Sequence, residues 1–120
     1  MKLLRESGDS GLRKEAASAL GRLRPEGALP ALAGALEGEQ DPEATRAIVA
    51  SLGQIRDPSS LPYLEKKARL APEKEIRLAA ASAIASVGGA EAMAILRSLV
   101  TTELDPGMRR HLERWIEKGN

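Results

Sequence analysis

The chain has 120 residues, enough for one domain with a modest core, and carries a formal net charge of +1. This charge argues against binding to nucleic acid or to an anionic membrane through bulk electrostatics. The absence of cysteine excludes disulfides and thiolate chemistry, and only 2% of the residues are aromatic. An aliphatic, alanine-rich core favours closely packed helices over a β-sheet, so we expect an all-α protein.

The N-terminal segment MKLLRESGDS contains only two consecutive leucines before charged residues and glycine intervene. It therefore indicates neither a signal peptide nor a lipid anchor. No apolar run elsewhere approaches the roughly 18 residues that a membrane span needs. We expect a cytoplasmic protein without membrane contact, a location that the absence of cysteine allows.

Apolar residues recur at helical spacing along the chain. After a short helix at about 2–6, this spacing predicts helices at about 10–23, 27–37, 42–55, 59–70, 73–87, 90–101 and 106–117. Every second helix starts with an acidic residue, whose carboxylate is expected to cap free backbone N–H groups: Asp9, Asp41, Glu73 and Asp105. Short turns rich in proline, glycine or serine separate the two helices of each pair.

The chain aligns with itself when it is shifted by 32 residues. Leu20 then falls on Leu52 and Ile84, and Gly21 falls on Gly53. Repeats of this length indicate a solenoid, because one two-helix unit cannot bury its apolar face alone. We therefore expect a single domain, 1–120, built from a half-repeat at 1–7, repeats at about 8–38, 40–70 and 72–102, and a C-terminal cap helix at 105–118.

The same alignment predicts the buried face of each helix. In the first copy the first helix is expected to bury five apolar residues: Leu12, Ala16, Ala19, Leu20 and Leu23. The second helix is expected to bury Leu29, Leu32 and Leu36. Side chains in the same rows of the later copies would continue one apolar seam through the stack.

Both ends of the repeat array differ from its middle. Leu4 lies one period before Leu36, so the chain would be either the tail of a longer solenoid or a complete small protein with a trimmed cap. Either arrangement would leave Leu3 and Leu4 near an uncovered edge. In the last helix Trp115 stands where the other copies have alanine or serine. We expect Trp115 to close that end by packing, and a docking surface is the alternative.

The strings LRKEAASALGRLRPEGALPAL and ATRAIVASLGQIRDPSSLPYL resemble the HEAT-like repeats first described in phycobilin lyases. Those repeats combine a DPxxxR start, an alanine-rich first helix ending in LGxI and a second helix with the pattern ALPAL. The resemblance covers about residues 8–117. It implies a right-handed α-α superhelix of about three helical hairpins plus terminal capping helices. The first helices would form the convex face, and the second helices a concave face that holds protein partners.

No catalytic constellation is visible in the sequence. His111 is the only histidine, and without a cysteine or a second histidine to share a metal we expect an ordinary surface side chain. The carboxylates mostly stand at helix starts, where they should be solvated, and the chain has no phosphate-binding loop and no HExxH motif. We predict a protein that is not an enzyme and needs no cofactor or metal.

The acidic residues at the helix starts stand near a recurring set of arginines. Such a ladder of charges could bind a charged ligand. We instead expect helix caps and i,i+4 ion pairs that stabilise each turn slightly. The arginines are Arg13, Arg46, Arg77 and Arg109.

The best candidate for a binding surface lies on the second helices. There Tyr63 and Ile95 occupy one row of the repeat and are predicted to point partly toward the concave side, with Lys66, Lys67 and Arg97 around them. An exposed tyrosine beside apolar and basic groups is typical of an interaction patch. The alternative is that Tyr63 packs across its own hairpin with its hydroxyl in water.

We therefore expect a protein-protein interaction scaffold or adaptor that binds a protein partner through the concave face. One alternative is a structural segment of a larger helical-repeat protein that self-associates through exposed solenoid ends. A bilin lyase-like or chaperone subunit is disfavoured because a bilin pocket needs aromatic walls. Nucleic-acid binding is disfavoured by the charge and by the scarcity of stacking side chains.

Overall fold

The computed structural model describes residue 4 and residues 8–119. Its helices are α2 (Ser10–Leu23), α3 (Ala28–Gly38), α4 (Pro42–Ile55), α5 (Leu61–Leu70), α6 (Lys74–Val87), α7 (Gly89–Thr102) and α8 (Pro106–Gly119). A short 3-10 turn, Pro58–Ser60, precedes α5. The predicted all-α fold is confirmed, and the described part of the chain contains no strand. The helix expected at 2–6 and the half-repeat at 1–7 lie outside the described residues, apart from Leu4.

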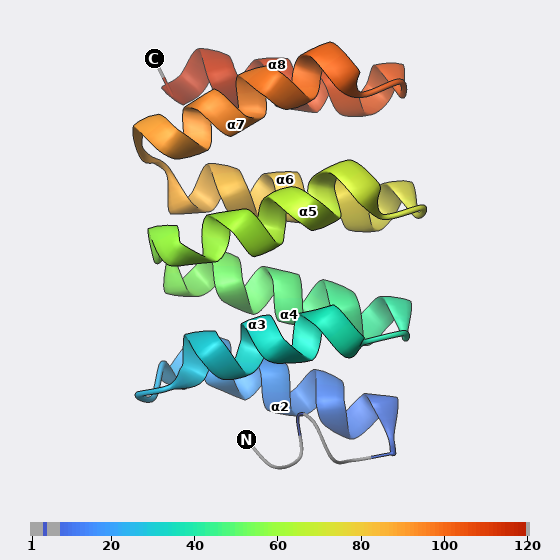
Figure 1. Cartoon of the computed structure of the whole chain (residues 1–120), viewed down its shortest axis with the longest axis vertical. Helices are drawn as coiled ribbons and strands as arrows, with labels where there is room; N and C mark the ends of the chain where they lie inside the picture. Colours follow the sequence, from blue (N-terminus) through green and yellow to red (C-terminus); the bar gives the residue numbers. More distant parts are fainter. Residues whose placement is uncertain (1–3, 5–7, 120) are drawn as a thin grey trace.

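The helices form two layers of a single stack (Figure 1). The first helices of the repeats, α2, α4 and α6, lie in one layer with α8, and the second helices α3, α5 and α7 lie in front of them. The stack measures 39 × 27 × 17 Å along its principal axes. All turns within a hairpin lie along one edge of the stack, and all loops between hairpins lie along the opposite edge.

Aspartate side chains cap the starts of α2, α4 and α8. Asp9 accepts the backbone N–H of Gly11 at 2.8 Å, and Asp41 accepts that of Ala44 at 2.9 Å. At the start of α8, Asp105 accepts the N–H of Met108 at 2.8 Å. The prediction of a carboxylate cap was wrong for Glu73, whose side chain makes no capping hydrogen bond. The reason is its extra methylene group, because the N-cap geometry suits the shorter aspartate.

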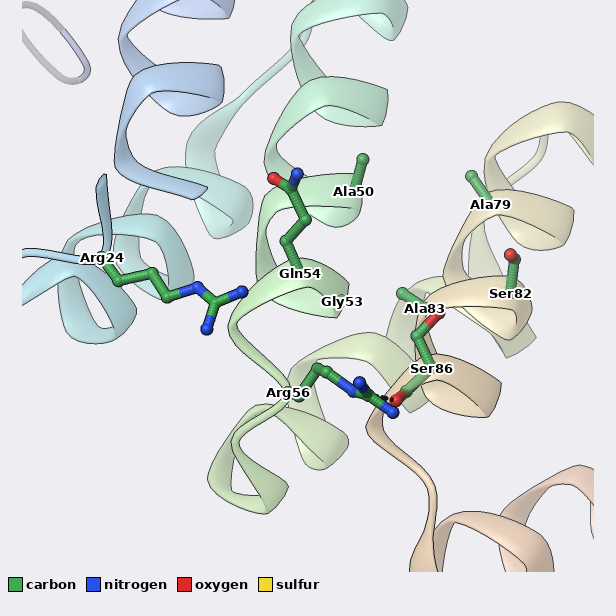
Figure 2. A pocket seen from close by; sticks show the side chains of 9 residues that line it. All are labelled: Arg24, Ala50, Gly53, Gln54, Arg56, Ala79, Ser82, Ala83 and Ser86. Carbon is green, nitrogen blue, oxygen red and sulfur yellow. Dashed lines mark hydrogen bonds between the residues drawn. The ribbon is translucent and has the colours of Figure 1, made fainter. Parts of the chain in front are cut away.

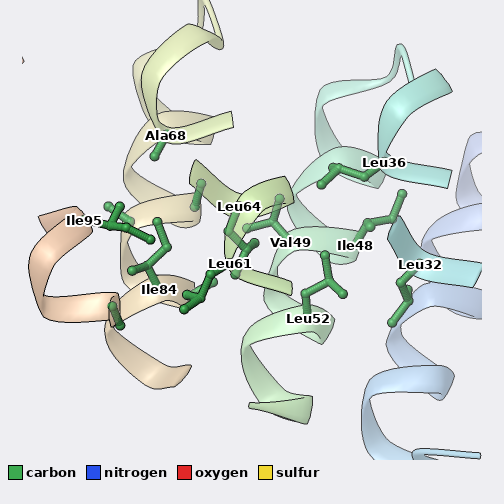
Figure 3. Packing of buried hydrophobic residues seen from close by; sticks show 14 of the residues in the cluster. Leu32, Leu36, Ile48, Val49, Leu52, Leu61, Leu64, Ala68, Ile84 and Ile95 are labelled. Carbon is green, nitrogen blue, oxygen red and sulfur yellow. The ribbon is translucent and has the colours of Figure 1, made fainter. Parts of the chain in front are cut away.

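One continuous core runs through the stack (Figure 3). Leu32 and Leu36 of α3 pack near Ile48 and Leu52 of α4, and further along Leu61 and Leu64 of α5 lie near Ile84 of α6. All seven side chains are at most 2% exposed. Leu4 belongs to the same core and is buried, so it does not lie at an uncovered edge as expected. The seam that the repeat predicted is therefore present.

Two of the side chains expected in this seam are outside it. Leu12 is 46% exposed and Leu23 is 75% exposed. Helix α2 lies at one end of the layer of first helices, so no described first helix packs against it on the side away from α4. In the later copies the residues in the row of Leu12 are buried, namely Ala44, Ile76 and Met108. Helical periodicity identified an apolar stripe but not the absence of a neighbour for it.

Small residues allow the first helices to approach closely. A Cβ atom at Gly21 would lie 2.8 Å from the Cβ of Ser51, and one at Gly53 would lie 3.0 Å from the Cα of Ala83. Between the same helices the hydroxyl of Ser51 donates to the carbonyl oxygen of Ala17 at 2.7 Å. The glycine of the LGxI pattern is therefore a contact residue between consecutive repeats.

Helix α8 covers the C-terminal end of the core, and the outer face of α8 is charged. Met108 and Leu112 are buried, and Trp115 is half-buried and packs against the core cluster, as expected of a closing side chain. On the opposite side of α8, Glu113 and Glu117 are exposed. The 32-residue alignment gives Glu113 the position of Ala17, Val49 and Ala81, and Glu117 that of Gly21, Gly53 and Ala85. A further layer packed in the same way would bury two carboxylates.

Candidate protein-interaction surface

The structure places only part of the predicted patch together. Tyr63 is 37% exposed on the outer side of α5, Lys66 is exposed beside it, and Lys67 is half-buried. Arg97 is exposed on α7, where it lines an open hollow together with Trp115 and Lys118. It therefore faces α8 rather than the tyrosine.

Ile95 was predicted to point partly toward the concave side, but the structure buries it. It is 8% exposed and lies in the core near Ile84 (Figure 3). Ile95 sits at the margin of the buried stripe of α7, which contains Ala92, Leu96 and Leu99. A branched aliphatic side chain at such a margin gains by folding onto the core, whereas Tyr63 in the same row is 37% exposed.

A second apolar side chain is exposed on α5, and it joins Tyr63 in the candidate surface instead of Ile95. Leu70 is 71% exposed, and with Tyr63 and Lys66 it follows the spacing i, i+3, i+7 along the outer side of the helix. We call these three residues the α5 strip. The sequence held a signal for Leu70: its row contains Gly38 and Thr102 in the other copies, and a row without apolar residues is not a core row.

Polar contacts hold the helix that carries the α5 strip. The guanidinium of Arg69 pairs with the carboxylate of Glu65 one turn earlier, with 2.8 Å between Nη2 and Oε2. The same Nη2 donates to the hydroxyl of Ser98 on α7 at 2.8 Å. Arg69 therefore connects α5 to α7 next to Leu70. This contact helps to hold in place the helix that carries the strip.

A further apolar side chain protrudes on the edge formed by the loops between hairpins. Leu104, in the loop between α7 and α8, is 89% exposed. It borders an open hollow that is also lined by Arg69, Arg77 and Glu103. Leu70 ends α5 at the same edge of the stack, so the two exposed leucines lie at successive connections between hairpins, Leu70 just before one and Leu104 within the next.

A further hollow lies between α4 and α6 on the layer of first helices (Figure 2). Alanine, serine and glycine from α4 and α6 line most of it, and Arg24, Gln54 and Arg56 project at its rim. The Nε of Arg56 donates to the carbonyl oxygen of Ser86 at 2.9 Å. This contact uses the guanidinium to join two consecutive repeats.

Three carboxyl groups have lowered pKa values because they accept hydrogen bonds that stabilise helix starts and loops. Hydrogen bonds from Arg13 lower the pKa of Glu39, and the backbone N–H of Met108 lowers the pKa of Asp105. The backbone N–H of Ser59 lowers the pKa of Asp57 in the turn before α5. Each of these carboxylates organises a loop or a helix start, and none belongs to the α5 strip.

His111 is half-buried on α8. Its Nδ1 lies 3.0 Å from Nη2 of Arg114, and its ring centroid lies 5.8 Å from that of Trp115. Residues 4 and 8–119 contain no group of three or more His, Asp or Glu side chains placed to hold a metal ion. Over the same residues, no helix is both long enough and apolar enough to cross a membrane.

A family model described as HEAT repeats matches residues 1–71 and 37–115. Together the two matches cover nearly the whole chain, and their overlap fits the repetition of one helical hairpin along the stack. The match is to HEAT repeats in general and does not identify the phycobilin-lyase type. A comparison with curated proteins found no match. The chain belongs to the HEAT-repeat family.

Proposed function

We propose that this protein is an interaction scaffold that binds a protein partner through the layer formed by α3, α5 and α7. HEAT repeats are generally protein-interaction scaffolds. The observation that carries the proposal is the α5 strip, where Tyr63 and Leu70 are exposed two turns apart with Lys66 between them. Tyrosine at a rigid surface contributes contact area at little cost in conformational entropy.

The chemistry of the α5 strip defines the partner that would fit. Two apolar side chains about 10 Å apart along a helix, seven residues at 1.5 Å each, suit an extended or helical segment with two apolar anchors. The ammonium group of Lys66 between them favours a carboxylate in that segment. The small residues of α3, including Gly34 and Ala35, leave room for the segment to lie across the layer.

The test uses the full chain as bait in extracts of its source cells. Proteins captured by the wild type are quantified against those captured by Tyr63→Ala and by Lys66→Glu. We expect one set of proteins to be lost at least about tenfold with both variants. Circular dichroism should be unchanged because both side chains are exposed. Capture of every protein at wild-type levels by both variants would contradict the proposal.

A matched control separates the α5 strip from general charge effects. Arg110→Glu reverses a charge on the outer face of α8, on another side of the stack. We expect this variant to retain the proteins that Lys66→Glu loses. Loss of the same proteins with both charge reversals would show that capture depends on net charge rather than on the strip. A cytoplasmic site of action is part of the proposal, and the absence of cysteine is compatible with it.

A further inference from the structure

The outer face of α2 has the residue pattern of an internal junction, but none of the helices α3 to α8 packs on it. Leu12, Ala16, Ala19 and Leu23 follow the spacing i, i+4, i+7, i+11 of one helix face. In α4 and α6 the first three of these positions are at most 5% exposed, as Ala44, Ile48 and Ser51 and as Ile76, Ala80 and Ala83. In α2, Leu12 and Leu23 are 46% and 75% exposed. We call these four residues the α2 stripe.

The other end of the stack does not fit this stripe. If copies of the chain stacked head to tail, the α2 stripe would meet the outer face of α8. That face presents Glu113 and Glu117, together with Arg110 and Arg114. Burying these charges against leucine and alanine would cost more than the contact returns. Head-to-tail assembly is therefore disfavoured, and the outer face of α8 is not the surface that complements the α2 stripe.

We infer that the α2 stripe pairs with the α2 stripe of a second copy, with the two helices antiparallel about a two-fold axis. Leu12 of each copy then packs against Leu23 of the other. The small side chains of Ala16 and Ala19 meet at the centre, where they allow close approach of the two backbones. The axis makes the contact self-complementary and closes it at two chains.

The charges beside the stripe select this orientation. Glu15 and Arg22 are exposed along one flank of the stripe, two turns apart, and neither joins an ion pair among the described residues. In the antiparallel pair Glu15 of each copy lies beside Arg22 of the other, which gives two symmetric ion pairs. A parallel pair would place the two copies of this flank on opposite sides, without charge partners.

This inference does not rest on the proposed function, because the α5 strip lies on another helix. The first test measures the molar mass of the full chain by sedimentation equilibrium over a concentration series. We expect a reversible dimer. Leu23→Glu should weaken it at least about a hundredfold by placing a carboxylate in the contact. Since Leu23 is exposed, the helical signal of this variant should match the wild type. A monomer up to millimolar concentration overturns the inference.

Charge reversal tests the register. Glu15→Arg and Arg22→Glu alone should each weaken the dimer about tenfold, because each creates two like-charge contacts. The double variant Glu15→Arg/Arg22→Glu should recover most of the loss, since both symmetric pairs return with reversed sign. Equal or greater weakening in the double variant overturns the antiparallel pairing.

Cysteine cross-linking tests the same geometry without altering charge, and the chain has no cysteine of its own. A mixture of Leu12→Cys and Leu23→Cys chains should form disulfide-linked heterodimers under mild oxidation. Leu23→Cys alone should not, because the antiparallel pair separates the two copies of residue 23 by about 16 Å, eleven residues at 1.5 Å each. Efficient cross-linking of Leu23→Cys alone would contradict the antiparallel arrangement.

Discussion

Arg77 in the third repeat and Glu103 in the loop that follows it form a two-pronged ion pair across 26 residues. The Nε and Nη2 atoms of Arg77 donate to the two carboxylate oxygens at 3.2 and 3.4 Å. Nη1 of the same arginine donates to the carbonyl oxygens of Ala71 and Pro72, both at 3.0 Å. One guanidinium therefore connects two successive loops between hairpins.

An equivalent ion pair is present in the first repeat, on the other side of the central repeat. Arg13 pairs with Glu39 at 2.8 and 3.0 Å, also 26 residues apart. The central repeat has Thr45 and Ala71 at the two equivalent positions, so both partners are replaced together. Thr45 donates instead to the carbonyl oxygen of Asp41 at 2.8 Å, and Ala71 is 7% exposed. The joint replacement leaves no buried carboxylate without its arginine.

The first prediction concerns this coupling. Arg77→Thr should lower the free energy of unfolding by about 1–3 kcal/mol, because it leaves the nearly buried carboxylate of Glu103 without its main donor. The double variant Arg77→Thr/Glu103→Ala, which copies the central repeat, should lose less than the sum of the two single variants. Urea denaturation of the four proteins gives the coupling energy. Strict additivity would contradict the proposed dependence of one residue on the other.

The second prediction is an acid sensitivity that depends on Glu39. Hydrogen bonds from Arg13 lower the pKa of Glu39 from its usual value of 4.5, and the N–H groups of Gln40 and Asp41 add to the effect. Because the folded pKa is the lower one, this stabilisation is fully present above pH 4.5 and is lost as the pH falls through the folded value.

Denaturation midpoints measured between pH 7 and pH 3 check the second prediction. Glu39→Gln should be less stable than the wild type at pH 7 and should lose less stability on acidification. The control Glu37→Gln changes an exposed carboxylate in the last turn of α3, two residues before Glu39, and should follow the wild-type curve. Parallel curves for wild type and Glu39→Gln would show that this carboxylate does not produce the acid sensitivity.

The third prediction contrasts two helical glycines. Gly21→Ala should destabilise the protein by about 1–2 kcal/mol despite the better helix propensity of alanine, since the new methyl group meets Ser51 of α4. Gly34→Ala adds the same methyl group on α3, where nothing lies within 4 Å, and should stabilise by about 0.5–1 kcal/mol. Thermal melts of both variants suffice, and equal shifts for the two would be inconsistent with the close contact of α2 and α4.

The fourth prediction concerns the ends of the first helices. Arg24 ends α2 in the left-handed region, with φ 49° and ψ 49°, whereas the third repeat has Gly88 at the equivalent position. Arg24→Gly should raise the free energy of unfolding by about 0.5–1 kcal/mol by removing the Cβ strain. Arg24→Ala keeps the Cβ atom and should give no gain. If alanine stabilises as much as glycine, the left-handed backbone is not the cause.

The fold could be predicted closely from the sequence because the apolar rows and the helix-start residues that determine it are local and periodic. The apolar rows and the turn and cap residues between them located each of the helices α2 to α8 to within two residues of its bounds. The Arg13–Glu39 and Arg77–Glu103 pairs were missed because i,i+4 neighbours were expected as partners, and a contact across 26 residues depends on how the hairpin closes. The joint change to Thr45 and Ala71 was visible in the alignment and could have indicated the pairing.

The candidate surface was harder to predict for a physical reason. Row alignment places a side chain on a face of its helix, but a residue at the margin of that face can turn either way, as Tyr63 and Ile95 do in the same row. The exposure of Leu12 and Leu23 had a different origin. Their pattern is that of a buried helix face, and only the arrangement of whole helices shows that no described neighbour covers it.

The recurrent small contact between first helices makes the hairpin an interchangeable building block. A duplicate of residues 41–72 inserted after residue 72 would set Ser51 of the new block against Gly53 of the old one. Gly21 and Ser51 already join α2 to α4 through the same combination. The protein could thus be lengthened by about 10 Å per inserted block, while α8, with Glu113 and Glu117 outward, would continue to close the extended stack.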